Sequence, residues 1–209
     1  MKDYFWASYS DLMTALFFVM LVLYILTFVK LKHDQEAYRV SALKYEKLQE
    51  IEKALSTLDD NLFEFDKENK RYKLKTDARF SPNSSDISTI PELRRNELRS
   101  AGRNIYELIE SLSKINENVN YLLILEGNAA RANNNHINYP NEGYKLSYNR
   151  ALALFNFWKD SGYDFRKLKN CEIIVAGSGH FGKSRESDEP QNKRFTIQIT
   201  GKIGEFKLD

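Results

Sequence analysis

The chain has 209 residues and a mass of 24.4 kDa, enough for one domain of ordinary size and additional segments. A formal net charge of +2 and a pI near 8.4 give no reason to expect a nucleic-acid partner. One cysteine, Cys171, excludes an internal disulfide framework and a multi-cysteine metal site. The mean hydropathy is −0.54, so the body of the chain is polar and its apolar residues are concentrated near the N-terminus.

An uncharged run of 18 residues, 12–29, follows the short polar start of the chain. As a helix it would extend about 27 Å, and about 37 Å when counted from Phe5, which is enough to cross a bilayer. A cleavable signal peptide is the rival interpretation, but Lys30 and Lys32 follow the run where a small-residue cleavage site would stand. The sequence therefore predicts a helix start at 1–11 and a transmembrane helix core at 12–29. The flanking lysines do not fix its orientation.

A carboxylate, Asp11, stands at the beginning of this apolar helix. In one interpretation it lies near the lipid headgroups and caps the helix start, where it complements the helix dipole. In the other it is an ionisable group kept at membrane depth for ion or proton transfer, where charge is costly. Small or polar residues share its helical face, which permits close approach of another helix: Ala7, Ser8, Thr14 and Ala15. Spacing alone leaves both interpretations open.

Residues 6–16, WASYSDLMTAL, resemble the signature of MotB-type stator subunits, the ion-channel partners of rotary motors. The resemblance implies that Asp11 takes up and releases the permeating proton or sodium ion, with Ser8 and Thr14 supporting the ion site. It also implies a single-pass protein of the bacterial inner membrane, with a cytoplasmic N-terminus and a periplasmic body. Within that family, the short arm before Phe5 is most similar to the ZorB-type subunits of the Zorya anti-phage defence system.

A charged stretch, 30–60, is predicted to continue the helix as a linker, since residues 31–80 contain no glycine or proline. Four apolar residues follow 3-4-3 spacing in it: Leu48, Ile51, Leu55 and Leu58. This stripe is too short to establish a coiled coil. Either it packs on its own domain, or it pairs two copies of the chain in parallel.

The rest of the chain alternates strands and helices, which predicts an α+β domain with a mixed sheet and helices packed on it. Period-two alternation predicts a hairpin at 62–65 and 72–75, and a final strand at 195–200. A short apolar run predicts a fully buried strand at 121–126, and a further strand is predicted at 172–176. Apolar residues at helical spacing predict helices at 92–115 and 145–161.

This order resembles the OmpA-like peptidoglycan-binding domain over residues 61–205. The landmarks are EGNAA at 126–130, GYKLSYNRA at 143–151 and NKRF at 192–195. The resemblance assigns Arg150 to the carboxylate of the diaminopimelate side chain, a role suited to its planar fork of donors. The family aspartate that binds the ammonium group is replaced by Ala130. The asparagine-rich loop 131–141 offers a different polar surface. The resemblance further places three residues at the peptidoglycan site: Asn128, Ser147 and Arg194.

No sequence pattern for covalent catalysis or for a metal site is present, so we expect no enzymatic activity and no cofactor. Two functions remain. The first is a wall-anchored stator subunit that couples ion flow to rotation of a MotA-like (ZorA-like) multi-span partner. The resemblance implies that this assembly contains five partner subunits and a homodimer of this chain. The second is a passive single-span tether to peptidoglycan, without ion conduction.

Overall fold

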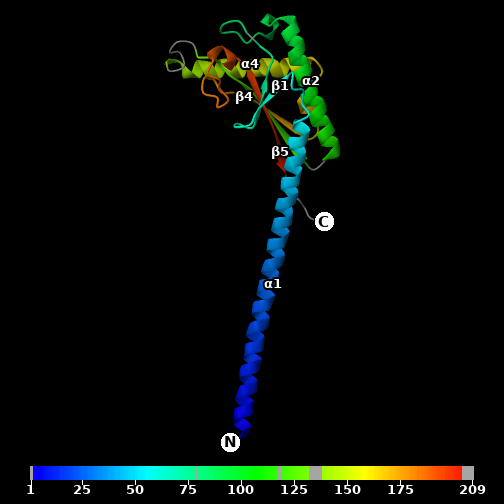
Figure 1. Ribbon diagram of the computed structural model, residues 1–209, viewed down its shortest axis with the longest axis vertical. Helices are drawn as coiled ribbons and strands as arrows, with labels where there is room; N and C mark the ends of the chain where they lie inside the picture. The colour runs from blue at the N-terminus through cyan, green and yellow to red at the C-terminus, as the bar shows by residue number, and fades with distance from the viewer. Residues whose placement is uncertain (1, 79, 117–118, 132–137, 204–209) are drawn as a thin grey trace. The chain divides into compact units, whose positions relative to one another are not determined.

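The computed structural model describes residues 2–78, 80–116, 119–131 and 138–203 of the chain (Figure 1). It divides into two compact units, residues 1–47 and residues 48–209. The boundary falls inside helix α1, Lys2–Leu55, so the second unit begins earlier than the domain start predicted at residue 61. Residues 132–137 of the predicted asparagine-rich loop, and the end of the predicted domain at 204–205, lie outside the described residues.

Helix α1 is uninterrupted because the chain contains no glycine or proline before Pro82. Of the described residues, only those of this helix form a segment long and apolar enough to cross a membrane. An 18-residue window within Tyr9–Leu55 has a mean hydropathy of 2.6, and none of that window is buried in the protein. The apolar run predicted at 12–29 lies wholly within the first unit.

The last turns of α1 and the residues after it belong to the core of the second unit. Ile51, Leu55 and Leu58 are buried there, whereas Leu48 keeps 41% of its surface exposed. Three of the four residues of the predicted stripe therefore pack on their own domain, which was the first of the two interpretations. A seam between two copies cannot run through these three side chains.

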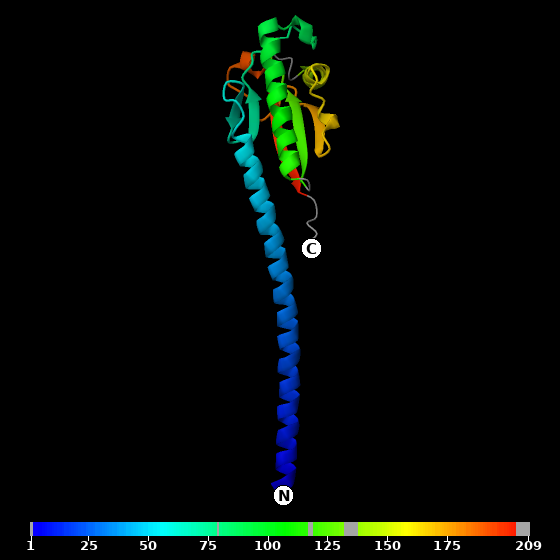
Figure 2. The ribbon, with the colours of Figure 1, turned by 90° about the vertical axis from the view of Figure 1, so that its right-hand side faces the viewer.

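One five-stranded sheet forms the centre of the second unit, in the order β1-β2-β5-β3-β4 (Figure 2). Strands β3 and β4 are parallel, and every other pair is antiparallel. β3 and β5 pair from Val119↔Ile203 to Gly127↔Phe195. The strands are β1 Phe63–Asp66, β2 Arg71–Leu74, β3 Val119–Gly127, β4 Cys171–Gly177 and β5 Phe195–Ile203.

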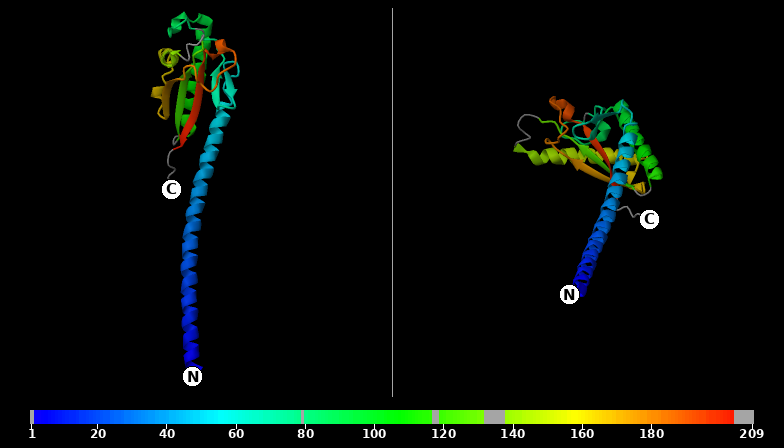
Figure 3. Two further views of the ribbon diagram at one scale, coloured as in Figure 1. Left: turned by 90° about the vertical axis from the view of Figure 1, so that its left-hand side faces the viewer. Right: turned by 60° about the horizontal axis from the view of Figure 1, so that its bottom comes forward.

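Two helices, α2 Glu92–Ile115 and α4 Pro140–Asp160, pack on one face of this sheet. Alternate residues of β3 are buried beneath them, among them Tyr121, Leu123 and Leu125. Between the helices, the buried indole Nε1–H of Trp158 donates a hydrogen bond to the carbonyl oxygen of Leu98 at 2.7 Å. The opposite face of the sheet, seen in the left view of Figure 3, is only partly buried.

The predicted fold class, a single N-terminal helix followed by an α+β domain with a mixed sheet, is confirmed. The helix predicted at 92–115 has the observed bounds, and each strand end lies within three residues of the predicted one. α4 begins five residues before the predicted Lys145, because Pro140 occupies the first turn, where no hydrogen-bond donor is needed. Three short 3-10 helices complete the described elements: η1 Ile87–Thr89, η2 Phe165–Lys167 and η3 Glu189–Asn192.

Truncating the buried end of α1 should destabilise the second unit. We expect Leu55→Ala to lower the free energy of unfolding by about 2–5 kcal/mol, because it leaves a cavity in the core. Chemical denaturation of the full chain in detergent, followed by circular dichroism, measures the change. The matched control is Leu48→Ala, one apolar position earlier and largely exposed, which should cost far less. Equal losses in the two variants would contradict the assignment of this segment to the domain core.

Candidate functional site

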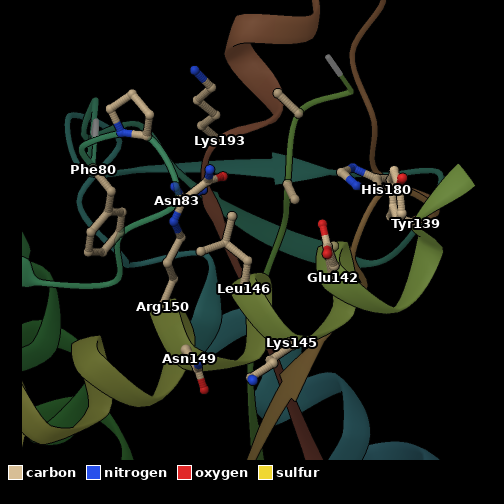
Figure 4. Close-up of a pocket in the computed structure, with 14 residues that line it drawn as sticks. Phe80, Asn83, Tyr139, Glu142, Lys145, Leu146, Asn149, Arg150, His180 and Lys193 are labelled. Atoms are coloured by element: carbon tan, nitrogen blue, oxygen red, sulfur yellow. The ribbon is translucent and has the colours of Figure 1, made fainter. Parts of the chain in front are cut away.

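A pocket of about 500 Å³ opens beside the N-terminal half of α4 (Figure 4). Three segments that are distant in sequence meet there: residues 80–83, Ala129 and Ala130 just after β3, and α4 itself. His180 and Lys193 complete the lining from the long connection between β4 and β5. Of the four residues that the resemblance placed at a peptidoglycan site, only Arg150 lines this pocket.

Arg150 is a buried cation that is only partly satisfied. Its side chain rises from α4 beside Asn83, and the whole residue is 5% exposed. Nε donates a hydrogen bond to the carbonyl oxygen of Ser84 at 3.0 Å, and the guanidinium carbon lies 5.1 Å from the ring centroid of Phe80. The two terminal nitrogens make no hydrogen bond or ion pair within the described residues. Burial lowers the pKa of Arg150, but an arginine stays charged at neutral pH.

The tight turn 81–84 presents the carbonyl group that Arg150 uses. Ser84 N–H closes this turn on the carbonyl oxygen of Ser81 at 3.1 Å, and Asn83 adopts a φ of 54°. Asparagine is one of the residues that tolerates this left-handed conformation. Since the turn holds Nε from one side and Phe80 covers the guanidinium, the remaining donors of Arg150 are fixed at the pocket.

The other charged residues of the pocket are Glu142, Lys145 and Lys193. Glu142 is the only carboxylate among the described lining residues, and Figure 4 shows it rising from the first turn of α4 into the pocket. Ala130, which the resemblance sets against the family aspartate, also lines the pocket and carries no charge. With three cations and one carboxylate, the pocket favours a ligand that presents an anionic group.

Asn128 and Ser147 lie outside the pocket lining, within the packing between the sheet, α4 and the loop after β4. Ser147 is fully buried; its hydroxyl donates to the carbonyl oxygen of Tyr144 and accepts from the N–H of Gly179, both at 2.9 Å. Asn128 Oδ1 accepts a hydrogen bond from the Ser178 hydroxyl at 2.7 Å. Both side chains hold the loop that follows β4 against its neighbours, which is a positioning role.

Arg194, the residue before β5, belongs to an ion-pair network outside the pocket lining. Its Nη2 donates to Glu186 Oε1 at 2.9 Å and to the carbonyl oxygen of Ser184 at 2.7 Å. Lys73 Nζ lies 2.7 Å from the same Glu186 oxygen and 3.4 Å from Asp66 Oδ2. Arg194 therefore ties the loop before β5 to strands β1 and β2. Its neighbour Lys193 lines the pocket in its place.

Sequence analysis missed Glu142, Asn149, Lys193 and the segment 80–83 as parts of the pocket. Asn149 and Lys193 stand inside the quoted landmarks, at 143–151 and 192–195, so the signal for them was present in the sequence. No local signal marks residues 80–83, because only the folded topology brings them to α4. The described residues contain no cluster of three or more potential metal ligands.

At the other end of the chain, Asp11 lies in the interior of α1, nine residues after its first residue. A cap or dipole effect is confined to the first turn of a helix, so this position does not fit the capping interpretation. Asp11 makes no hydrogen bond or ion pair within the described residues. The Thr14 hydroxyl donates to the carbonyl oxygen of Ser10 on its own helix, at 2.8 Å. Ser8 belongs to α1, and its side chain lies outside the described part of the chain.

The chain is similar to several solved structures at low sequence identity. No family model matches the chain, and no curated protein matches it. The periplasmic domain of Helicobacter pylori MotB is 15% identical over 63% of this chain and 74% of that one, with a TM-score of 0.43. An outer membrane protein of Borrelia burgdorferi is 24% identical over 65% and 95%, with a TM-score of 0.40. The peptidoglycan-associated lipoprotein of Burkholderia pseudomallei is 12% identical over 59% and 88%, with a TM-score of 0.38.

The network around Glu186 predicts a pH-dependent stability. Hydrogen bonds from Lys73 and Arg194 hold the pKa of Glu186 below its ordinary value of 4.5. A carboxyl group with a lowered folded-state pKa stabilises the fold above its unfolded pKa, and this stabilisation is lost as pH falls through the folded pKa. Glu186→Gln should therefore lower the melting temperature at pH 7, and the difference from the unmodified chain should shrink below about pH 4.

Thermal unfolding of both proteins across pH 3–7 checks this. Glu64→Gln, an exposed change on β1, is the control and should have little effect at any pH. A deficit for Glu186→Gln that stays constant across this range would show that the charge of Glu186 is not what stabilises the loop.

Proposed function

We propose that this chain is a single-pass membrane protein whose second unit binds cell-wall peptidoglycan through the pocket at Arg150. The observation that carries the proposal is the guanidinium of Arg150, which is buried and held on one side while its terminal donors remain open at the pocket. A charge of this kind is costly unless water or a ligand at the pocket completes its hydrogen bonds. A carboxylate, which can accept two parallel hydrogen bonds, is the group that this geometry fits best.

The charges of the pocket match the zwitterionic end of a diaminopimelate side chain. Arg150 is the partner for its carboxylate. Ala130 supplies no charge for the ammonium group, and Glu142 is the carboxylate that remains for it at this pocket. The site would then use an acid from α4 where the resembling family uses one from the loop after the central strand.

Removing the guanidinium of Arg150 should weaken attachment to the wall. We expect Arg150→Ala to reduce affinity for purified sacculi by about tenfold or more, because charge-assisted hydrogen bonds are lost. Arg150→Lys should be intermediate, since it keeps the charge and loses the planar fork. Co-sedimentation of the full chain in detergent with sacculi measures the affinity, and free diaminopimelate should compete.

Arg166→Ala is the matched control for this experiment. Arg166 also lies over an aromatic ring, 5.5 Å from the centroid of Phe155, but it is paired with Asp164 at 2.9 Å and lies outside the pocket. Its loss should leave sedimentation unchanged. An unmodified chain that never sediments with sacculi would overturn the proposed ligand.

For the first unit we propose that α1 crosses the bacterial inner membrane and that Asp11 carries protons or sodium ions across it. The interior position of Asp11 supports this, because a helix cap would not need a carboxylate there. One spanning helix cannot enclose an ion path, so a multi-span MotA-like (ZorA-like) subunit is required, in the five-to-two assembly that the resemblance implies. The N-terminus would be cytoplasmic and the second unit periplasmic. The whole assembly would act in anti-phage defence.

Two copies of the chain would pair along α1 before the domain begins. Leu31, Tyr38 and Tyr45 are exposed and repeat every seven residues, which places them on one side of the helix. Such a seam lies within the first unit, upstream of the stripe residues that the domain core uses. It would bring two Asp11 carboxylates into one assembly.

Removing the charge of Asp11 should abolish function and leave assembly intact. Asp11→Asn preserves the shape of the side chain but cannot take up and release a proton or bind a cation as a carboxylate does. We expect phage plating on cells with this variant to rise to the level of cells without the chain. Tyr38→Cys, added to the unmodified chain and to Asp11→Asn, should give the same yield of disulfide-linked dimer in both proteins.

Asp34→Asn is the control, since Asp34 lies on the same helix outside the uncharged run and should tolerate the change. If cells with Asp11→Asn resist phage as well as unmodified cells do, α1 is a passive anchor, which is the alternative function.

A further inference from the structure

Two exposed aromatic side chains lie beside the pocket and are not used in it. Tyr144 of α4 and Phe181 of the loop after β4 have ring centroids 5.9 Å apart and planes inclined by 27°. Rings in direct face contact are separated by about 3.5 Å, so these two are offset and each keeps part of its face open. Tyr144 is 42% exposed and Phe181 47% exposed. We call this pair the aromatic platform.

The loop that carries Phe181 is fixed on α4 by its backbone. Gly179 donates its N–H to the buried Ser147 hydroxyl at 2.9 Å and accepts the N–H of Ala129 at 2.9 Å. Its φ of +57° is one that residues with a Cβ rarely adopt, and a Cβ there would lie 3.0 Å from the Tyr144 nitrogen. Phe181 N–H then closes a turn on the Ser178 carbonyl oxygen at 3.0 Å. The platform is therefore held in place before any ligand arrives, which lowers the entropic cost of binding.

Polar groups border the platform and join it to the pocket. The guanidinium carbon of Arg131 lies 6.0 Å from the Phe181 ring centroid, and its Nε donates to the carbonyl oxygen of His180 at 3.2 Å. Gly143 and His180, the chain neighbours of the two platform residues, both line the pocket. The platform therefore adjoins the pocket on both of the segments that carry it.

We propose that the aromatic platform binds the apolar face of a hexopyranose ring, an N-acetylhexosamine of the wall glycan. A pyranose ring presents C–H groups on its faces and hydroxyl groups around its rim. These match two partly exposed rings, one of which has a guanidinium over it. A protein partner is less suited, because two half-exposed rings offer far less than the roughly 1,200 Å² of a stable protein interface. The identification of this sugar rests on the proposed function, since a stem peptide in the pocket is joined to such a glycan.

Binding of chitotetraose, a peptide-free tetramer of N-acetylglucosamine, tests the platform separately from the pocket. With the full chain in detergent, titration calorimetry should show saturable binding. Tyr144→Ala and Phe181→Ala should each weaken it by about threefold to tenfold, the usual effect of one aromatic contact. Tyr144→Phe and Phe181→Tyr keep the rings and should retain binding, which separates loss of contact from loss of folding.

Phe65→Ala is the matched control: Phe65 is 41% exposed and pairs with Tyr72, with ring centroids 4.8 Å apart, on β1 and β2. Arg150→Ala should leave chitotetraose binding unchanged while it weakens binding to sacculi. No saturable binding by the unmodified chain, or equal losses in platform and control variants, would overturn the platform. An unmodified chain that binds chitotetraose but never sediments with sacculi would overturn the pocket proposal and leave the platform standing.

Discussion

The site depends on the close contact between α4 and the backbone at the ends of the neighbouring strands β3 and β4. A Cβ on Gly127, the last residue of β3, would lie 2.1 Å from the carbonyl oxygen of Ser147, so the helix rests on the strand end itself. Ser147 also accepts the Gly179 N–H that follows β4. Because one helix is fixed against both strand ends, its N-terminal half is held rigidly, and with it both Arg150 and Tyr144.

Arg150 shows how this scaffold can keep a charge in a buried position. The Ser84 carbonyl group and the Phe80 ring offset part of the cost of removing a guanidinium from water. The carbonyl group and the ring contact only one edge and one face of the guanidinium. Arg194 is only partly buried, and its Nη2 is bound by Glu186 and the Ser184 carbonyl group. Arg150 is more deeply buried, has no carboxylate partner within the described residues and lines the pocket, which makes it the better candidate for ligand recognition.

The sequence predicted what periodicity and local composition determine. Strand alternation and helical spacing located the sheet and α2, and one landmark led to Arg150. The stripe from Leu48 to Leu58 shows the limit, since an amphipathic pattern indicates that a face is buried but not what covers it. Arg194 and Lys193 are adjacent, and the local sequence does not tell which of them turns toward α4. Residues 80–83 could not be assigned, because long-range folding alone brings their turn to Arg150.

The proposed contacts at the pocket and at the platform are of different kinds but share one rigid support, which matters for a polymeric ligand. A guanidinium that binds a carboxylate gives a directional, charge-assisted interaction, and this interaction weakens as salt screens the charges. Aromatic faces contribute apolar contact that salt scarcely affects. When both groups bind one continuous strand, the second contact forms at the high effective concentration set by the first. Under the two proposals, modest contacts on α4 and its attached loop would together give firmer attachment than either contact alone.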